Sequence, residues 1–126
     1  MRRHKRAAIV IVHFGALPKW FSVWLHTAKL NSGIDFHLFQ DATEERQDVN
    51  IFYHNMSIMD YNDLPLLKAE RCVLKNPYKV CDFRPLIAEM FPAVVGPYQY
   101  WGWGDLDVIY GDILSVIGKS SFDKFD

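Results

Sequence analysis

The first third of the chain alternates between apolar runs and a stretch with helical spacing. Residues 7–14 are continuously apolar and rich in β-branched side chains, which is typical of a strand covered on both faces. Gly15 and Pro18 interrupt this run. Residues 19–30 then carry apolar side chains at the spacing of an amphipathic helix. Asn31-Ser32-Gly33 supplies the signal that ends such a helix.

The remaining pattern predicts more strands and helices in alternation. We expect a strand over 34–39 that ends at Gln40-Asp41, a polar loop over 42–48, and a weaker strand over 49–54. Residues 60–73 have helical character with a break at Pro65. Asp82 has the properties of an N-cap for a helix that runs to Phe91. A last strand, rich in aromatic residues and glycine and expected to be buried, is predicted over 98–103, followed by a helix over 112–117. This order predicts an α/β fold, with a mostly parallel Rossmann-like sheet flanked by helices.

Sheets of this kind bind ligands beyond the carboxyl ends of their strands, where the strand order reverses. The residues that follow the predicted strands include several polar or glycine positions. We therefore expect one rim of the sheet to collect the following residues: His13, Phe14, Gly15, Asp41, Asp105 and Asp107.

Asp105 and Asp107 are the residues most suggestive of chemistry. In an extended chain, residues i and i+2 point to the same side and lie roughly 6–7 Å apart, while Leu106 would turn into the protein. That spacing suits a shared divalent cation of the magnesium type, held by one or two carboxylates and the phosphates of a substrate. The alternative is that both aspartates are solvated or form turns.

Composition limits the other possibilities. The 126 residues are half hydrophobic with a net charge of −1, which predicts one folded domain and does not favour a nucleic-acid partner. The basic run at 2–6 precedes only six apolar residues and no cleavage site, so a signal peptide is not favoured. No stretch is long enough for a membrane span. Cys72 and Cys81 have neither metal nor disulfide spacing, and we expect buried free thiols.

Three ordered motifs resemble a known family. They are Phe14-Gly15-Ala16-Leu17-Pro18, Tyr78-Lys79-Val80-Cys81-Asp82-Phe83-Arg84-Pro85, and Trp101-Gly102-Trp103-Gly104-Asp105-Leu106-Asp107 with Gly111-Asp112 after it. The chain resembles the amino-terminal half of GT-A-type glycosyltransferases, and more narrowly a bacterial group of GT-A-like proteins. The resemblance runs from about Ala8 to Asp112.

The resemblance implies a nucleotide diphospho-sugar donor, with a UDP-sugar favoured, and Mn²⁺ or Mg²⁺ as cofactor. By matching position, Asp107 would be the main metal ligand, and Asp105 would contact the ribose or sugar and the metal shell. His13, Phe14 and Gly15 would lie by the nucleotide. Asp82 and Arg84 would lie near the donor sugar.

Each further donor-site residue also has a plain structural interpretation. Arg84 suits a diphosphate through bidentate hydrogen bonds, yet exposed arginines are common. Lys79 could neutralise phosphate or simply be solvated. Asp41 could bind a ribose hydroxyl or form a turn. His13 could be a core histidine, and Asp82 a helix cap.

The resulting hypothesis is a metal-dependent glycosyltransferase that moves a sugar to the hydroxyl of a glycan or lipid-linked acceptor. Because complete GT-A domains are about twice this length, we expect residues 1–126 to be the nucleotide-sugar-binding portion, incomplete at the C-terminus. The alternatives are a non-catalytic module that binds nucleotide sugar and metal, or an inactive truncated homologue. We expect a cytoplasmic location, or a peripheral one at the membrane.

Overall fold

A five-stranded sheet forms the centre of the computed structural model, which describes residues 7–117. The strand order is β3-β4-β2-β1-β5. Four strands run parallel to one another: β1 (Ala7–His13), β2 (Ile34–Gln40), β4 (Ile51–Asn55) and β5 (Tyr100–Trp103). The remaining strand, β3 (Arg46–Asp48), pairs antiparallel with β4. The expected α/β fold with a mostly parallel sheet is confirmed. The basic run 2–6 and the C-terminal residues 118–126 lie outside the described part.

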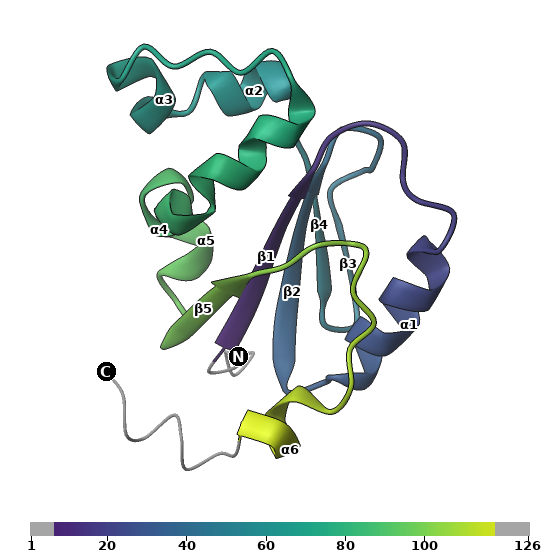
Figure 1. Cartoon of the computed structure of the whole chain (residues 1–126). Helices are drawn as coiled ribbons and strands as arrows, with labels where there is room; N and C mark the ends of the chain where they lie inside the picture. Colours follow the sequence, from purple (N-terminus) through teal and green to yellow (C-terminus); the bar gives the residue numbers. More distant parts are fainter. Residues whose placement is uncertain (1–6, 118–126) are drawn as a thin grey trace.

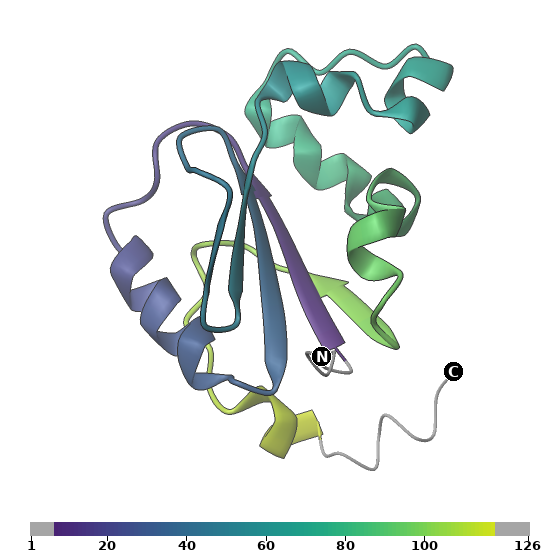
Figure 2. The same ribbon diagram turned by 180° about the vertical axis from the view of Figure 1, so that it is seen from behind.

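Helices cover both faces of this sheet (Figures 1 and 2). One side carries the following helices in chain order: α2 (Ile58–Asn62), α3 (Pro65–Ala69), the 3-10 helix η1 (Pro77–Leu86), α4 (Ile87–Met90) and α5 (Pro92–Val95). The other side carries α1 (Phe21–Leu30), with α6 (Ile113–Ile117) near its end. The chain therefore has three layers, as βαβ connections require.

The alternation of side chains along β1 supplies both cores. Val10 and Phe14 face the α2–α5 side, where they pack with Tyr61, Ile87 and Phe91. Ile11 faces the α1 side and packs in a second cluster of buried residues, which includes Trp24, Phe36, Ile51 and Leu106. Both faces are apolar because β1 and β2 are central strands, which explains the continuous hydrophobic run at the start of the sequence.

Asn50 is a buried polar residue that joins three elements. Its side-chain amide donates to the carbonyl oxygens of Ala28 (3.0 Å), Asn31 (3.0 Å) and Ile34 (2.8 Å), and its side chain is fully buried. These carbonyls belong to the end of α1 and the start of β2. A single amide thus cross-links backbone acceptors at the α1–β2 corner, two of which also accept from the backbone N–H groups of Asn31 and Ile34.

Several local predictions are wrong. The segment 42–48 is not all loop, because Arg46–Asp48 forms the edge strand β3. Asp82 is not an N-cap: it lies inside η1, which Asn76 caps by accepting from the Tyr78 backbone N–H at 3.0 Å. The α-helix of this region is limited to Ile87–Met90. Pro77 and Pro85 both lie within η1 and lack the N–H groups that a regular α-helix needs.

The two cysteines are free, as expected, but they are not both buried. Cys81 is exposed and Cys72 is partly exposed. Within residues 7–117, no helix has the length and apolar character needed to cross a membrane.

Candidate functional site at the β1–β5 junction

The strand order reverses beside β1. From β1 the chain proceeds to β2 and then β4 on one side, and it later returns to add β5 on the other side of β1. In open α/β sheets this junction is where ligands bind, beyond the carboxyl ends of the two strands. The sequence places Asp105 and Asp107 directly after β5, on this junction.

The geometry expected for the two aspartates is wrong in one respect. β5 ends at Trp103, level with Val10 of β1, and residues 106–107 form a turn. β5 is also a partly exposed edge strand and not the buried strand expected. Strand periodicity therefore does not fix the relative direction of the two carboxylates. Leu106 is buried between them, as predicted.

Hydrogen bonds to β1 and to the residues at both ends of α1 hold the turn in place. The backbone N–H of Gly104 donates to the carbonyl of Val10 (3.2 Å), which continues the β1–β5 pairing by one residue. The indole N–H of Trp20 donates to the carbonyl of Leu106 at 2.8 Å. The segment after the turn then runs along α1, where Asn31 donates to the Gly111 carbonyl and accepts from the Ile113 N–H, both at 2.9 Å. The aspartates thus project from an anchored turn.

Asp105 forms an ion pair with Arg84. One guanidinium nitrogen of Arg84, near the end of η1, donates to Asp105 Oδ1. The Arg84 side chain is 23 % exposed and that of Asp105 is 44 % exposed, so the pair lies at the surface. Asp107 is exposed. One carboxylate is therefore partly neutralised by an arginine, while the other faces solvent.

The charges of both carboxylates influence the hydroxyl of Tyr110. Burial raises the pKa of its hydroxyl, a hydrogen bond from the indole of Trp24 (3.4 Å) lowers it, and the charges of Asp105 and Asp107 raise it further. Both carboxylates consequently lie close enough to this hydroxyl to be felt through space. The sequence did not indicate Tyr110 as part of the site.

The surface beside Arg84 is only slightly hollowed. A cavity of about 10 Å³ lies between β1, η1 and α4, with Arg84, Trp103 and Gly104 in its wall. That volume holds about one water molecule and is far below the roughly 300–1,000 Å³ of small-molecule pockets. The Trp103 ring is 48 % exposed and lies at this edge. A large ligand would have to bind across an open surface here.

A second cluster joins the ends of β1 and β2. The N–H of Gly15, whose φ is +95°, donates to Asp41 Oδ1 at 3.1 Å, and the amide of Gln40 donates to the Gly15 carbonyl at 2.7 Å. His13 Nε2 lies 2.9 Å from the Ala16 carbonyl oxygen. The prediction that Gly15 and Asp41 share a rim is confirmed. Gln40, which is fully buried, organises this loop and was missed because a glutamine after a strand has no distinctive pattern.

The other predicted donor-site residues fall in different surroundings. Phe14 is buried in the core with its ring edge-on to Tyr61 (5.7 Å between centroids), so its side chain packs inside the protein. Lys79 and Asp82 are exposed and pair with each other in η1 at 3.8 Å. The structure thus brings Arg84 to Asp105 and Gly15 to Asp41, but it uses Phe14 for the core.

Comparison with known proteins identifies a family whose function is unknown. The model of a family of unknown function, DUF6625, matches residues 9–126. The chain belongs to this family. The DUF6625 match contains both clusters, from Gly15 in the loop after β1 to Asp107 in the turn after β5. No curated protein and no solved structure matches the chain. The likeness to GT-A glycosyltransferases therefore stays a prediction.

Proposed function

We propose that this DUF6625 chain is the nucleotide-sugar-binding portion of a metal-dependent glycosyltransferase of GT-A-like, Rossmann-like type. The observation that carries the proposal is the position of Asp105 and Asp107, on an anchored turn where the strand order reverses. The arginine next to them supports it, since Arg84 has the shape and charge to bind a diphosphate in bidentate fashion. The cofactor would be Mn²⁺ or Mg²⁺.

The two carboxylates suit such an ion in number and chemistry. Magnesium-type ions are commonly held by one or two carboxylates together with substrate phosphates and water. Among residues 7–117, no group of three or more His, Cys, Asp or Glu side chains is placed to hold a metal ion. Asp107, which is exposed, would be the first ligand, and Asp105 would join it. A bound ion would neutralise charge on the departing diphosphate.

Arg84 and Asp105 then have linked roles. In the structure the guanidinium satisfies Asp105. A ligand that presents phosphate to Arg84 and a cation to Asp105 would replace this one ion pair by two, which keeps every charge compensated. The donor would lie across the open surface between this pair and the Gly15–Asp41 loop, with the exposed ring of Trp103 at its edge.

A second candidate is a module that binds nucleotide sugar and metal without turnover. The specific observation in its favour is that the described residues beside Asp105 and Asp107 are an arginine, tryptophans, apolar side chains and Tyr110, whose raised pKa keeps its hydroxyl protonated at neutral pH. None of these is an ordinary general base. An acceptor-side base would have to come from elsewhere.

Titration calorimetry with UDP and Mn²⁺, combined with a donor-hydrolysis assay on UDP-sugars, tests the proposal. We expect binding that requires both components and is lost in Asp107→Asn. The control is Asp63→Asn, which removes an exposed carboxylate that pairs only with the exposed Lys68. Binding without hydrolysis would favour the module. Equal binding by wild type and Asp107→Asn, or no binding at all, would refute the metal site.

A further inference from the structure

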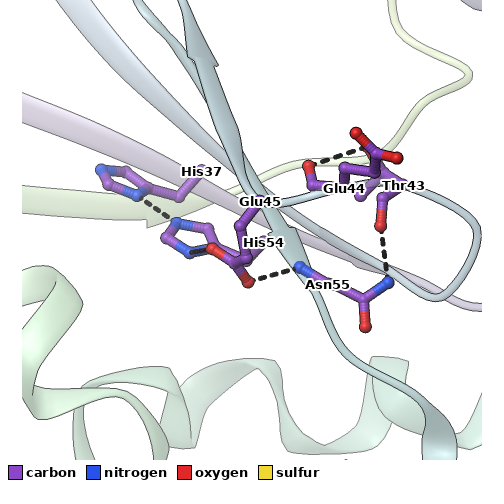
Figure 3. Close-up of polar contacts among 6 residues, drawn as sticks. All are labelled: His37, Thr43, Glu44, Glu45, His54 and Asn55. Atoms are coloured by element: carbon purple, nitrogen blue, oxygen red, sulfur yellow. Dashed lines mark hydrogen bonds and ion pairs between the residues drawn. The ribbon is translucent and has the colours of Figure 1, made fainter.

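A chain of hydrogen-bonded titratable groups crosses the α2–α5 face of the sheet, away from the aspartate turn. His37 of β2 lies at its centre, with Nδ1 2.8 Å from His54 Nε2 and Nε2 2.9 Å from the Tyr98 hydroxyl. Tyr98 donates to Asp35 Oδ2 at 2.7 Å. At the other end, His54 Nδ1 lies 3.6 Å from Glu45 Oε2. We call these five residues the histidine network. Figure 3 shows its outer half.

The direction of each hydrogen bond follows from the last one. Because Tyr98 uses its only proton on Asp35, its oxygen must accept from His37 Nε2–H. A neutral His37 then has an unprotonated Nδ1, which accepts from His54 Nε2–H. His54 Nδ1 is left as the acceptor that faces Glu45. An unprotonated nitrogen therefore faces a carboxylate with no hydrogen between them, so the network lacks one proton at this end when both histidines are neutral.

The network has room for one extra proton but not for two. The first proton can enter at His54 Nδ1, where the Glu45 carboxylate compensates the charge. A second proton would have to enter at His37 Nδ1, which would place two N–H groups against each other at 2.8 Å. It would also put two positive rings in a stack with centroids 5.1 Å apart. The His37–His54 hydrogen bond must break at that step.

His54 is the partner that can leave. His37 is 6 % exposed and is held between Tyr98 and the ring of Phe52, which stacks on it at 4.5 Å. The His54 side chain is 23 % exposed and lies near the end of β4, between β2 and the edge strand β3. Its neighbour Glu45 also accepts from the backbone N–H of Asn55 at 2.6 Å (Figure 3). Glu45 thereby ties the segment before β3 to the end of β4.

We propose that the histidine network is an acid-sensitive latch, which holds residues 42–45, the segment before β3, against the end of β4 at neutral pH and releases it when both histidines are protonated. The charged and titratable groups around the pair are Asp35 on β2, Glu45 before β3 and Tyr98 before β5. Asp41 immediately precedes the released segment, so release would also loosen the Gly15–Asp41 loop. The latch would act whatever ligand the aspartate turn binds.

The sign of the pH dependence follows from burial. The pKa of His37 is lowered to about 4, chiefly by burial and also by the nearby His54, while the charge of Asp35 acts in the opposite direction. Burial also lowers the pKa of His54, and Glu45 raises it. A released His37 would titrate near its ordinary 6.5. The open form therefore binds more protons than the closed form between pH 6.5 and 4, and the latch loses stability as the pH falls through this window.

Amide hydrogen exchange of the full chain between pH 7 and 4.5, corrected for intrinsic rates, tests the latch. The Asn55 amide is the reporter because it binds Glu45. We expect its opening equilibrium to increase on the order of 50-fold over this range, while amides of β1 stay protected. Side-chain ¹⁵N spectra should show His54 taking up its proton before His37.

Glutamine variants separate the histidines from other acid effects. His37→Gln and His54→Gln cannot become charged, and either should flatten the pH dependence at Asn55. His54→Gln lies at a partly exposed site and serves if His37→Gln does not fold. His26→Gln, at an exposed position of α1, is the control and should behave as wild type. A loss of protection that persists in both network variants would assign the effect to Glu45, and a loss shared by all strands would indicate global unfolding. Either result would overturn the latch.

Discussion

Replacing Arg84 by methionine should change metal binding and nucleotide binding in opposite directions. Arg84 compensates the charge of Asp105 in the structure, so it competes with a cation for that carboxylate. In the proposed complex the same guanidinium binds the diphosphate. Methionine keeps much of the apolar stem that lines the small cavity beside Val10 and Val80 and removes only the charged group.

The size of the expected change in metal binding follows from the solvent exposure of the Arg84–Asp105 ion pair. Both side chains are partly exposed, at 23 % and 44 %, so the ion pair contributes at most about 1 kcal/mol. Freeing Asp105 should therefore tighten Mn²⁺ binding by up to about 5-fold. Loss of the guanidinium removes charge-assisted hydrogen bonds to phosphate, which contribute roughly 1.5–3 kcal/mol. Binding of UDP in the presence of Mn²⁺ should weaken about 10-fold or more.

Calorimetry and tryptophan fluorescence measure both effects. Mn²⁺ alone and UDP with saturating Mn²⁺ are titrated into wild type and Arg84→Met, and the half-exposed Trp103 reports binding near the turn. Lys68→Met is the control, because Lys68 is an exposed cation on α3 that pairs with Asp63 and not with the aspartates of the turn. Changes of the same sign for both ligands, or no change in either, would refute the linked roles of Arg84 and Asp105.

Two further predictions concern how the fold positions the turn and the strands. Asn50→Ala should lower the free energy of unfolding by about 1–3 kcal/mol, because the buried amide and its hydrogen bonds to three carbonyls are lost; urea unfolding measures this, and an effect as small as that of the exposed control Gln47→Ala would contradict it. Gly104→Ala should cost about 1–3 kcal/mol, since its Cβ would lie 2.8 Å from the Tyr110 hydroxyl and 3.2 Å from Ile9. The matched change Gly102→Ala meets nothing within 4 Å, so thermal unfolding that ranks the two variants equally would show that Gly104 is not a packing constraint.

The parts of the fold that sequence predicted well are those decided by local pattern. The apolar run at the start forms β1 because both faces of a central strand are buried, and the spacing of Trp24 and Ala28 forms α1. The segment around Asp82 was misjudged for a physical reason. Its capping chemistry is local, but Asn76 caps the segment earlier, with Pro77 in the first turn, and Pro85 inside the segment lacks the N–H that a continuous α-helix from Asp82 to Phe91 would use.

The candidate site was predictable in residue type but not in geometry. Two carboxylates after the last strand gave its position, because connection order places that strand at the junction beside β1. Their spacing could not be obtained in the same way, since the strand ends at Trp103 and the chain turns so that the Leu106 carbonyl accepts from the Trp20 indole. The Arg84–Asp105 pair joins residues 21 positions apart. Such long-range pairing depends on how η1 lies against the sheet, which no local pattern encodes.

The histidine network illustrates the same limit more strongly. His37 and His54 are far apart in the sequence and lack zinc-ligand spacing, so no local pattern indicates that they meet. Parallel pairing of β2 with β4 puts Phe39 opposite His54 and Phe52 opposite His37, and thereby brings the two rings together on one face. Register, not spacing, creates the hydrogen bond between them. Acid that releases the segment after Asp41 would also affect ligand binding at the Gly15 loop. The pH dependence of that binding would then be set by protonation of His37 and His54, which lie outside the loop. The test is to measure ligand affinity and Asn55 amide protection together between pH 7 and 4.5. If protection is lost while the affinity stays unchanged, the latch and the loop are independent.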